Sequence, residues 1–381
     1  MITIQNLTFG GTFSYETPNL PPSPIYLWTW GNNAYGQLGL GDTTNRSSPV
    51  QVGFSSWLSV SDSMAIRSDG TLWAWGKNPN GRLGLGDTAN RSSPTQVGAL
   101  TNWTVVKSQY GYDTGPTIAI KSDGTLWAWG ANAYGQLGLG DTANRSSPVQ
   151  VGALTTWSSG TISVRGVLAV KTDGTLWAWG QNYFGNLGLD NATNYSSPKQ
   201  VGALTDWINI NGALNPVSVK ANGTLWSWGR NNSGQLGLGD TTVRSSPTQI
   251  GSDTNWAYAT SARQGQTFAV KTDGTMWSWG RNYGGSLGLG SSNSSLAYSS
   301  PKQIGALTNW SRVSTGRFNV HAIKTNGTLW SWGANYSGMS GLGNTTEYRS
   351  PKQVGSLTTW TVLSLPPSSD DAMAALQSAL N

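Results

Sequence analysis

Four aspartates each precede an arginine by four residues, and their carboxylates are the first candidates for acid–base chemistry. The pairs are Asp42 with Arg46, Asp87 with Arg91, Asp141 with Arg145 and Asp240 with Arg244. Catalysis needs different groups in one place with pKa values pushed apart, whereas these pairs recur at equivalent positions of a repeated sequence. The pattern therefore favours four separate loop ion pairs over one catalytic site.

Glycine-rich loops are the second candidate, because backbone N–H groups in such loops can cradle phosphate. The phrase Gly-Gln-Leu-Gly-Leu-Gly-Asp is complete at residues 135–141, and variants of it follow every Trp-x-Trp-Gly phrase. A phosphate cradle of this kind sits at a helix N-terminus, and no helical pattern follows these loops. We interpret the glycines as residues that allow positive φ angles in compact loops.

The side chains that usually hold metals or act as nucleophiles are nearly missing. The chain has one histidine, His321, and no cysteine. A lone histidine does not complete a zinc site, and no serine or acidic motif points to it as a base. The sequence therefore predicts no catalytic residue, no metal site and no cofactor, with His321 in a structural role.

A repeated tryptophan phrase organises the whole chain. The Trp-x-Trp-Gly phrase occurs seven times, at intervals of 45 to 54 residues. It begins at Trp28, Trp73, Trp127, Trp177, Trp226, Trp277 and Trp330. A third tryptophan closes each repeat, so three per repeat account for all 21 tryptophans. A period near 50 residues indicates a repeat protein.

The phrase suits a strand buried on both faces. In Leu126-Trp-Ala-Trp129 the two tryptophans share one face, and the leucine and alanine share the other. Such a strand fits radial blades, where the bulky face of one sheet packs on the small face of the next. We predict an all-β fold, a seven-bladed β-propeller whose closure protects the sheet edges.

Each repeat reads as four short strands, called a, b, c and d in chain order. The third repeat supplies the examples, which are 103–107, 117–121, 125–129 and 148–151. Asp-Gly and Asn-Gly pairs mark tight b–c turns. In an up-and-down blade the a–b and c–d loops share one face of the disc, which we take as the working face.

The two ends of the chain are expected to complete one blade. The first repeat begins at strand c, and the C-terminal 373–378 resembles a b strand at 64–68. We infer that C-terminal a and b strands pair with N-terminal c and d strands to close the ring. The alternative is a short C-terminal helix that starts at Asp370 or Asp371, because alanine, leucine and methionine favour helices.

Residues 1–24 form a separate N-terminal arm before the propeller of residues 25–381. The arm reads as a hairpin followed by a proline-rich spacer. An isolated hairpin is marginal in water, so we expect the arm to dock on another protein subunit by strand addition or apolar contact. The expected docking residues are Ile2, Ile4, Leu7, Phe9, Phe13 and Tyr15.

Composition limits the other partners. Charged residues make up 10% of the chain, and its basic residues are scattered singly despite a net charge of +6. This pattern predicts no nucleic-acid partner. The N-terminus lacks the features of a signal peptide and no apolar run reaches membrane-spanning length, so we expect neither secretion by that route nor membrane insertion.

Aromatic residues that vary between repeats mark a candidate ligand face. Tyr134 and Phe184 precede the first glycine of two c–d loops, and Tyr110 and Tyr112 lie on the longest a–b loop. Such aromatics anchor protein interfaces and sugars alike. Basic residues at the b–c turns are read as a solvated rim, with attraction to an anionic partner as the alternative. They are Arg67, Lys121, Lys171, Lys220, Lys271 and Lys324.

The repeat closely resembles those of the regulator of chromosome condensation family and of bacterial and phage proteins related to the alpha-tubulin suppressor. The resemblance rests on Leu-Trp-x-Trp-Gly-x-Asn-x-x-Gly-Gln-Leu-Gly-Leu-Gly-Asp. It implies a seven-bladed propeller with four-stranded blades. The eukaryotic founder exchanges nucleotide on a small GTPase through a wedge-like insertion and reaches chromatin partly through a basic tail. No loop here is long enough for the wedge, and residues 1–24 contain no lysine or arginine.

We therefore expect a non-enzymatic structural or recognition module. The resemblance to phage members, together with the charge-poor surface, points to a component of a tailed-phage virion that acts in assembly or host-surface attachment. A bacterial cytosolic protein-interaction propeller is one alternative. A lectin-like propeller that binds a host glycan is the other.

Overall fold

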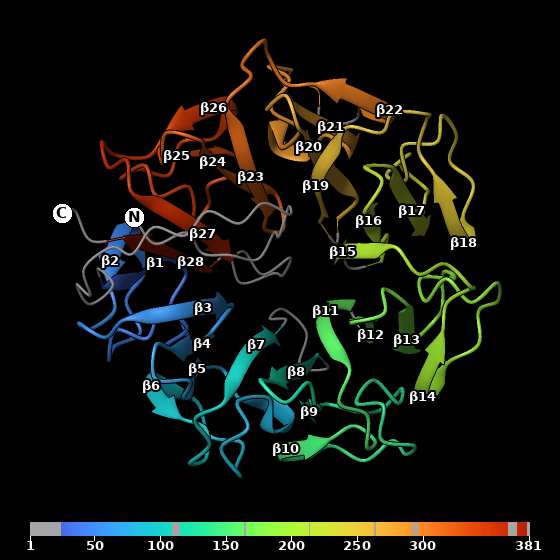
Figure 1. Ribbon diagram of the computed structural model, residues 1–381. Coiled ribbons are helices and arrows are strands. Elements are labelled where there is room, and N and C mark those ends of the chain that lie inside the picture. The colour runs from blue at the N-terminus through green and yellow to red at the C-terminus, as the bar shows by residue number, and fades with distance from the viewer. Residues whose placement is uncertain are drawn as a thin grey trace, which may run out of the picture.

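Seven four-stranded antiparallel sheets surround a common axis in the computed structural model (Figure 1). The structure describes residues 24–108, 115–163, 165–212, 214–262, 264–291, 293, 296–364 and 372–378. The fold is the seven-bladed β-propeller that the repeats predict, with four strands in every blade. The predicted arm, with Ile2, Ile4, Leu7, Phe9, Phe13 and Tyr15, lies outside the described residues apart from Pro24.

Strand positions a to d run from the axis outward in each blade. Position a holds β3 (Trp57–Ser61), β7 (Trp103–Ser108), β11 (Trp157–Ser163), β15 (Trp207–Asn211), β19 (Trp256–Ser261), β23 (Trp310–Thr315) and β27 (Trp360–Ser364). Position b holds β4 (Met64–Arg67), β8 (Pro116–Lys121), β12 (Gly166–Lys171), β16 (Val217–Lys220), β20 (Gln266–Lys271), β24 (Asn319–Lys324) and β28 (Ala372–Ser378).

The two outer positions follow the same order. Position c holds β1 (Ile25–Gly31), β5 (Leu72–Gly76), β9 (Leu126–Gly130), β13 (Leu176–Gly180), β17 (Leu225–Gly229), β21 (Met276–Arg281) and β25 (Leu329–Gly333). Position d holds β2 (Arg46–Gln51), β6 (Arg91–Gln96), β10 (Arg145–Gln150), β14 (Tyr195–Gln200), β18 (Arg244–Gln249), β22 (Ala297–Gln303) and β26 (Tyr348–Gln353). Two short 3-10 turns, η1 (Pro79–Gly81) and η2 (Tyr283–Gly285), lie in c–d loops.

The d strands begin earlier than the sequence suggested. In the third repeat, β10 starts at Arg145 rather than at Pro148. Arg145 pairs with Gly130 and Val149 pairs with Ala128, with an irregularity between them. A bulge therefore lets the Arg-Ser-Ser segment join the sheet, and Pro148, which has no N–H to donate, is tolerated in this outermost strand.

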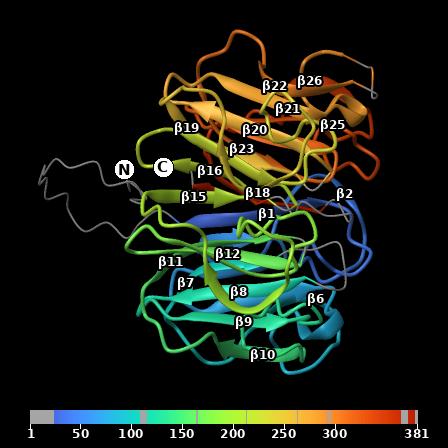
Figure 2. The same cartoon turned by 90° about the vertical axis from the view of Figure 1, so that its right-hand side faces the viewer.

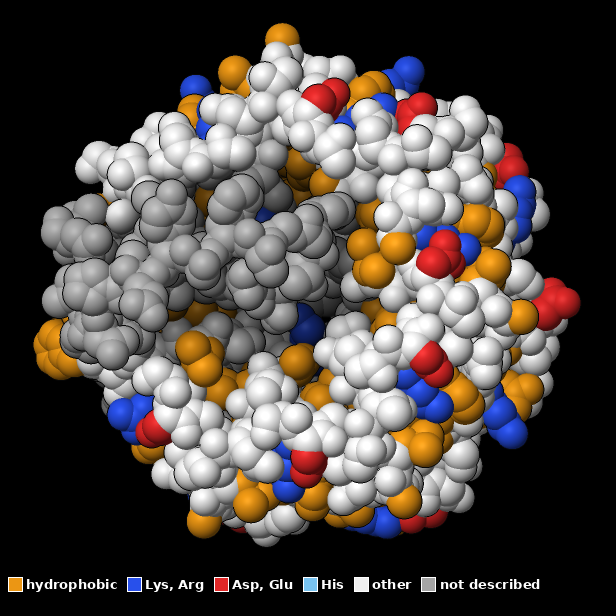
Figure 3. Space-filling view, viewed as in Figure 1, with side chains coloured by type: hydrophobic (Ala, Val, Ile, Leu, Met, Phe, Trp, Pro, Cys, Tyr) orange, Lys and Arg blue, Asp and Glu red, His pale blue; other side chains and the backbone are white. Residues whose placement is uncertain are grey.

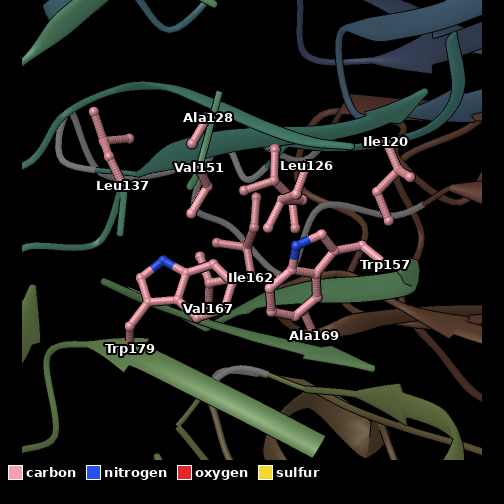
Figure 4. Close-up of a cluster of buried hydrophobic side chains, with 11 residues drawn as sticks. Ile120, Leu126, Ala128, Leu137, Val151, Trp157, Ile162, Val167, Ala169 and Trp179 are labelled. Atoms are coloured by element: carbon pink, nitrogen blue, oxygen red, sulfur yellow. The ribbon is translucent and has the colours of Figure 1, made fainter. Parts of the chain in front are cut away.

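Neighbouring blades pack a bulky face on a small one. Leu126 and Ala128 of β9 lie against Trp157 and Trp179 of the next blade, as Figure 4 shows. All four side chains are at most 3% exposed. The two tryptophans meet edge to face, with ring centroids 5.9 Å apart, a geometry that adds to their burial. This is the interlocking that the two-faced c strand predicts.

Each blade is also joined to its neighbour by an indole hydrogen bond. The second tryptophan of each c strand donates from Nε1 to a backbone carbonyl in the c–d loop of the preceding blade, at 2.9 to 3.1 Å. The donor–acceptor pairs are Trp30 with Met339, Trp75 with Gln37, Trp129 with Arg82, Trp179 with Gln136, Trp228 with Asn186, Trp279 with Gln235 and Trp332 with Ser286. The same contact thus recurs at every blade junction, including the one that closes the ring.

The ring closes in a blade built from both ends of the chain. β28 lies between β27 and β1, with Ile25 opposite Ser378 and Gly31 opposite Ala372. The helical alternative for the C-terminus is wrong, because Leu376 is fully buried between blades as a b-strand residue. Tertiary packing overrides the helix propensity of this alanine-rich segment.

The two faces of the disc are built from different connections, and Figure 2 shows the strands running between them. On one face, called the b–c face, each b–c turn rests on a d–a link, which is the segment that joins strand d of one blade to strand a of the next. There the Trp103 N–H donates to the Gly70 carbonyl, and Gly70, at φ +77°, leaves no room for a Cβ beside the Thr101 carbonyl. On the other face a–b and c–d loops meet, as the Arg82–Asp62 contact shows. Ile25, opposite Ser378 at the end of the b strand β28, begins β1 at the b–c face.

Candidate functional site

The c–d loops are held by an asparagine at their base. In the third repeat the Asn132 side-chain amide donates to the backbone carbonyl and carboxylate of Asp141, and its Oδ1 accepts from the Leu137 N–H. Gly135, at φ +74°, packs so closely on Ser196 of the next blade that a Cβ would clash. The Gly138 N–H donates to the Gly135 carbonyl and the Gly140 N–H to the Ser196 carbonyl. These amide groups donate within the loop and across the blade junction. The glycines are therefore structural, as predicted from the sequence.

The four Asp–Arg pairs are ion pairs in four separate loops. Each joins an arginine NH2 group to the carboxylate four residues earlier at 2.6 Å. Hydrogen bonds from the Thr44 N–H and from Arg46 hold the pKa of Asp42 below its usual value, and Arg91 is the largest cause of the same shift at Asp87. The prediction of loop ion pairs is confirmed. No group of three or more potential metal ligands occurs in the described ranges.

His321 is a buried core residue on β24. Its side chain is fully buried, Nε2 lies 3.3 Å from the Ser340 carbonyl oxygen, and its ring packs against Trp30. Burial lowers its pKa to about 3. In the other blades Ile118, Leu168 and Phe268 occupy the equivalent place of the b strand. The structural role predicted for His321 is confirmed.

The burial of neutral His321 makes stability depend on pH. The unfolded imidazole binds a proton near pH 6.5, whereas the folded one does so only near pH 3. Between these values the unfolded state holds more protons, so the free energy of unfolding falls as the pH falls. We expect His321→Leu, which restores the residue of the equivalent blade position, to reduce the loss of stability between about pH 7 and pH 5. Urea unfolding of both proteins at the two pH values measures this, and equal losses would contradict it.

Tyr134 and Phe184 lie on adjacent c–d loops of the a–b/c–d face, and both carry contacts to the next blade. The Arg165 guanidinium lies 4.9 Å from the Tyr134 ring centroid and donates to its hydroxyl at 3.0 Å. Arg230 lies 5.5 Å from the Phe184 ring. The same arrangement recurs at Tyr35, which has Lys77 of the next blade 4.7 Å from its ring. These aromatics therefore take part in blade contacts, a role that sequence reasoning missed. Tyr110 and Tyr112 lie outside the described residues.

A second aromatic group on this face was missed from sequence. The rings of Tyr283 and Phe318 lie 4.3 Å apart, and the hydroxyl of Tyr336 lies 3.4 Å from that of Tyr283. Tyr336 and, on the loop of Phe184, Tyr183 are 61% and 72% exposed. The signal was available, because Tyr283 and Tyr336 follow the loop asparagine directly, as does Tyr183, which the sequence already placed beside Phe184 in the candidate aromatic patch.

A buried ion pair lies where the loops of the second repeat meet. Arg82 and Asp62 are joined at 2.7 Å with both side chains 3% exposed, and Arg82 also donates to the Ser108 hydroxyl. Arg82 occupies the loop position that holds glutamine in Gln37, Gln136 and Gln235. Asp62 is one of three described non-glycine residues with positive φ, at 57°. The arginine at position 82, where three other repeats have glutamine, was the only feature of the sequence that pointed to this ion pair.

The basic residues at the b–c turns do not form a solvated rim, which corrects the favoured sequence interpretation. Lys121 is 8% exposed, and its ammonium lies 3.8 Å from the ring of Trp127 and 5.2 Å from that of Trp103. The same lysine–tryptophan stacking recurs at Lys171, Lys220, Lys271 and Lys324, and Arg67 stacks on Trp73. Each cation covers its blade's tryptophans. Burial lowers the pKa of Lys324.

The b–c turns that carry these cations are fixed by a chain of hydrogen bonds. The Trp127 indole donates to the Thr125 hydroxyl, which donates to Asp123 at 2.6 Å. These bonds from Thr125 also hold the pKa of Asp123 below its usual value. No helix in the described part of the chain has the length and apolar character to cross a membrane.

Several solved structures share this architecture. Human WBSCR16 superposes with a TM-score of 0.80 at 19% identity, covering 94% of this chain and 100% of that one. Prp20p from Saccharomyces cerevisiae, described with its binding to Gsp1p and histones, gives 0.80 at 18% identity, covering 94% and 92%. Yeast RCC1 (Prp20) in its complex with Kap60 gives 0.79 at 16% identity, covering 100% and 97%. At these identities the likeness shows the fold alone.

Sequence relatives match over a shorter stretch. Mouse protein RCC2 is 38% identical over 79 residues, which are 20% of this chain and 15% of the mouse protein. Human protein RCC2 matches with the same identity and coverage. The match therefore spans only a small part of each relative.

A family model for the regulator of chromosome condensation (RCC1) repeat matches most of the chain. The matched segments are residues 26–62, 69–114, 123–164, 173–212, 222–270 and 273–323. Strands β25 to β28 follow the last segment: β25 and β26 complete the blade of β23 and β24, and β27 and β28 close the ring with β1 and β2. Six repeat matches and a closed seven-bladed ring together show that the chain belongs to the regulator of chromosome condensation (RCC1) repeat family.

Proposed function

We propose that this propeller is a non-enzymatic recognition module that binds a protein partner through its a–b/c–d face. The observation that carries the proposal is the grouping of tyrosine and arginine on that face. Tyr183 and Tyr336 are largely exposed there, beside Phe184 with Arg230 and Phe318 with Arg317. Tyrosine and arginine are enriched among residues that dominate binding energy.

The opposite face, formed by the b–c turns and d–a links, exposes leucines rather than tyrosine and arginine. Half-exposed leucines recur on the d–a links at Leu100, Leu154, Leu204 and Leu307. Leucine is under-represented among interface hot spots, and scattered exposed apolar residues are normal on soluble proteins. The Prp20 structures are described with protein partners for that propeller, namely Gsp1p, histones and Kap60. They support a protein as the class of partner here.

Site-specific crosslinking tests which face binds. We expect a photoreactive residue at Tyr183, 72% exposed, to crosslink a protein in extracts of the source organism. A photoreactive residue at Phe54, 90% exposed on a d–a link, is the matched control and should give no such product. Crosslinks from position 54 alone would place the partner on the other face. A glycan array tests the lectin alternative, with Tyr134→Ala and Phe184→Ala as the comparison.

We further propose that residues 1–24 attach the propeller to another subunit. Because Ile25 enters β1 from the b–c face, an arm there leaves the a–b/c–d face free for recognition. A chain that begins at Pro24 should keep the thermal unfolding of the propeller and lose assembly, measured by light scattering. Normal assembly of the truncated chain would remove the arm's proposed role.

The finer hypothesis of a tailed-phage virion component rests on composition and on the resemblance to phage members. Neighbouring capsid or tail genes would support it. An isolated locus in a bacterial chromosome would favour the cytosolic interaction propeller instead.

A further inference from the structure

The two faces of the disc differ in how their charges are arranged. On the b–c face, basic residues and aspartates lie next to each other, and Figure 3 shows blue and red side chains adjoining around that face. The neighbours are Arg67 with Asp69, Lys121 with Asp123, Lys171 with Asp173, Lys220 with Asp206, and Lys271 with Asp253 and Asp273. Because Lys324 offsets the second aspartate beside Lys271, the described b–c turns and d–a links carry no net charge.

The inner part of the a–b/c–d face carries an excess of positive charge. Lys77 and Arg230 directly follow the c strands β5 and β17, and Arg281 ends the c strand β21. Arg165 and Arg317 lie in a–b loops, between β11 and β12 and between β23 and β24. These residues come from different blades, so cations that are scattered singly along the sequence lie on one surface of the folded ring.

The acidic residues on the described part of this face are already matched, at its outer edge or in a buried ion pair. They pair as Asp42 with Arg46, Asp87 with Arg91, Asp141 with Arg145, Asp240 with Arg244, Glu347 with Arg349, and Asp62 with Arg82. Asp190 accepts a hydrogen bond from Ser246 of the outermost strand β18. Arg230, Arg281 and Arg317 form no ion pair with any described residue. Arg281 is exposed and the other two are partly exposed, so all three can meet a partner.

Aromatic rings hold these three guanidinium groups in place. The distances from guanidinium carbon to ring centroid are 5.5 Å for Arg230 and Phe184, 5.7 Å for Arg281 and Tyr283, and 5.0 Å for Arg317 and Phe318. The Arg230 Nε also donates to the Asn232 side chain at 2.9 Å. A guanidinium that is already oriented loses less conformational freedom on binding, and its planar fork matches a carboxylate through two parallel hydrogen bonds.

We propose that the protein partner of the a–b/c–d face presents an acidic segment, rich in aspartate and glutamate, to Arg230, Arg281 and Arg317. This inference rests on the proposed protein-binding function and adds the chemistry of the partner. Tyr183 lies on the blade before that of Arg230, and Tyr336 lies on the blade of Arg317, so both tyrosines supply contacts beside the charges. Complementary charge raises the association rate and excludes wrong partners more than it adds affinity.

Single-stranded nucleic acid is the other anionic polymer that arginine and aromatic residues bind. It needs open aromatic faces on which its bases stack. Here Tyr283 and Phe318 pack on each other with ring centroids 4.3 Å apart, and an arginine lies near each ring. The rings are therefore engaged within the protein, which favours an acidic polypeptide.

Fluorescence anisotropy of a labelled oligoglutamate peptide, titrated with the full chain at low salt, tests this charge preference. We expect binding that weakens as sodium chloride is added, because salt screens exposed charges. The combined substitutions Arg230→Gln, Arg281→Gln and Arg317→Gln should weaken the affinity about tenfold, since each surface ion pair contributes a modest amount.

A matched control separates the effect of this face from that of net charge. It combines Lys199→Gln, Lys302→Gln and Lys352→Gln, which are exposed lysines of the outermost strands β14, β22 and β26. The control removes the same net charge as the arginine variant and should leave the affinity nearly unchanged. Thermal unfolding of both variants, expected to match that of the unmodified chain, shows that a loss of binding does not come from unfolding.

The proposal is overturned if oligoglutamate does not bind the unmodified chain, or if the arginine and lysine variants bind it equally well. Tighter binding of an oligodeoxythymidylate of equal charge would also overturn it in favour of nucleic acid. The crosslinking test at Tyr183 is read separately. A protein product there, together with any of these outcomes, leaves the proposed protein-binding function standing, whereas the absence of that product removes the function itself.

Discussion

Replacing Arg82 with methionine is expected to lower the free energy of unfolding by about 3–5 kcal/mol, the largest effect of any single charged residue described here. Arg82 and Asp62 are both 3% exposed and 2.7 Å apart. Removing the guanidinium leaves the Asp62 carboxylate buried without its counter-charge, and the desolvation of that carboxylate is no longer offset. The change also removes the hydrogen bond to the Ser108 hydroxyl on the next blade.

Urea unfolding at neutral pH measures this effect, and two variants separate its causes. Asp62→Asn with Arg82→Gln keeps polar groups of similar size and removes both charges, and asparagine tolerates the positive φ of position 62. We expect this double variant to recover much of the stability. Arg91→Met breaks a partly exposed ion pair and should barely change the free energy of unfolding. If Arg82→Met costs no more than Arg91→Met, the buried pair does not stabilise the ring.

Trp179→Ala is expected to cost about 3–5 kcal/mol, as is usual for removing a buried tryptophan. Its ring is fully buried between blades, against Leu126, Ala128 and Leu137 (Figure 4). Its Nε1 donates to the Gln136 carbonyl at 3.1 Å. The substitution therefore opens a cavity and removes the hydrogen bond at one junction. Closed rings depend on every junction, so we expect unfolding to remain cooperative at a lower urea midpoint.

Two further substitutions divide the contribution of Trp179. Trp179→Phe keeps most of the apolar area but removes the indole hydrogen bond to the Gln136 carbonyl, at a cost of about 0.5–1.5 kcal/mol. Trp177→Ala removes a half-buried ring of the same strand and should cost less than Trp179→Ala. A phenylalanine variant as stable as the unmodified chain would show that the indole hydrogen bond adds nothing to the blade junction.

The sequence predicted least at positions where one repeat carries a different residue type from the other repeats. Arg82 and Lys107 each replace a residue type that other repeats share. The partner of Arg82 lies on another loop, since Asp62 is 20 residues away in the chain. Comparison of the repeats shows that the residue at such a position is unusual. It does not show which side chains contact that residue in the folded ring.

The lysines of the b–c turns illustrate a different limit. Lys121 ends a strand and precedes a turn, a position that ordinarily means exposure. Its long apolar stem instead lies along the tryptophans, with the ammonium 3.8 Å from the Trp127 ring. Lysine has both an apolar stem and a charged end, so sequence alone does not decide whether it is solvated or stacked on an aromatic ring.

The number of blades, the four strands in each and the b–c turns could be predicted from the sequence, which also favoured closure by both ends. The repeated features could be predicted because each follows from local patterns that recur seven times, such as the alternation in Leu126-Trp-Ala-Trp129. The contact of Tyr134 with Arg165, and the choice of strand over helix for β28, emerged from the folded ring. The physical reason is that a local pattern specifies the blade, whereas contacts between blades depend on how the closed ring sets their angles and spacing.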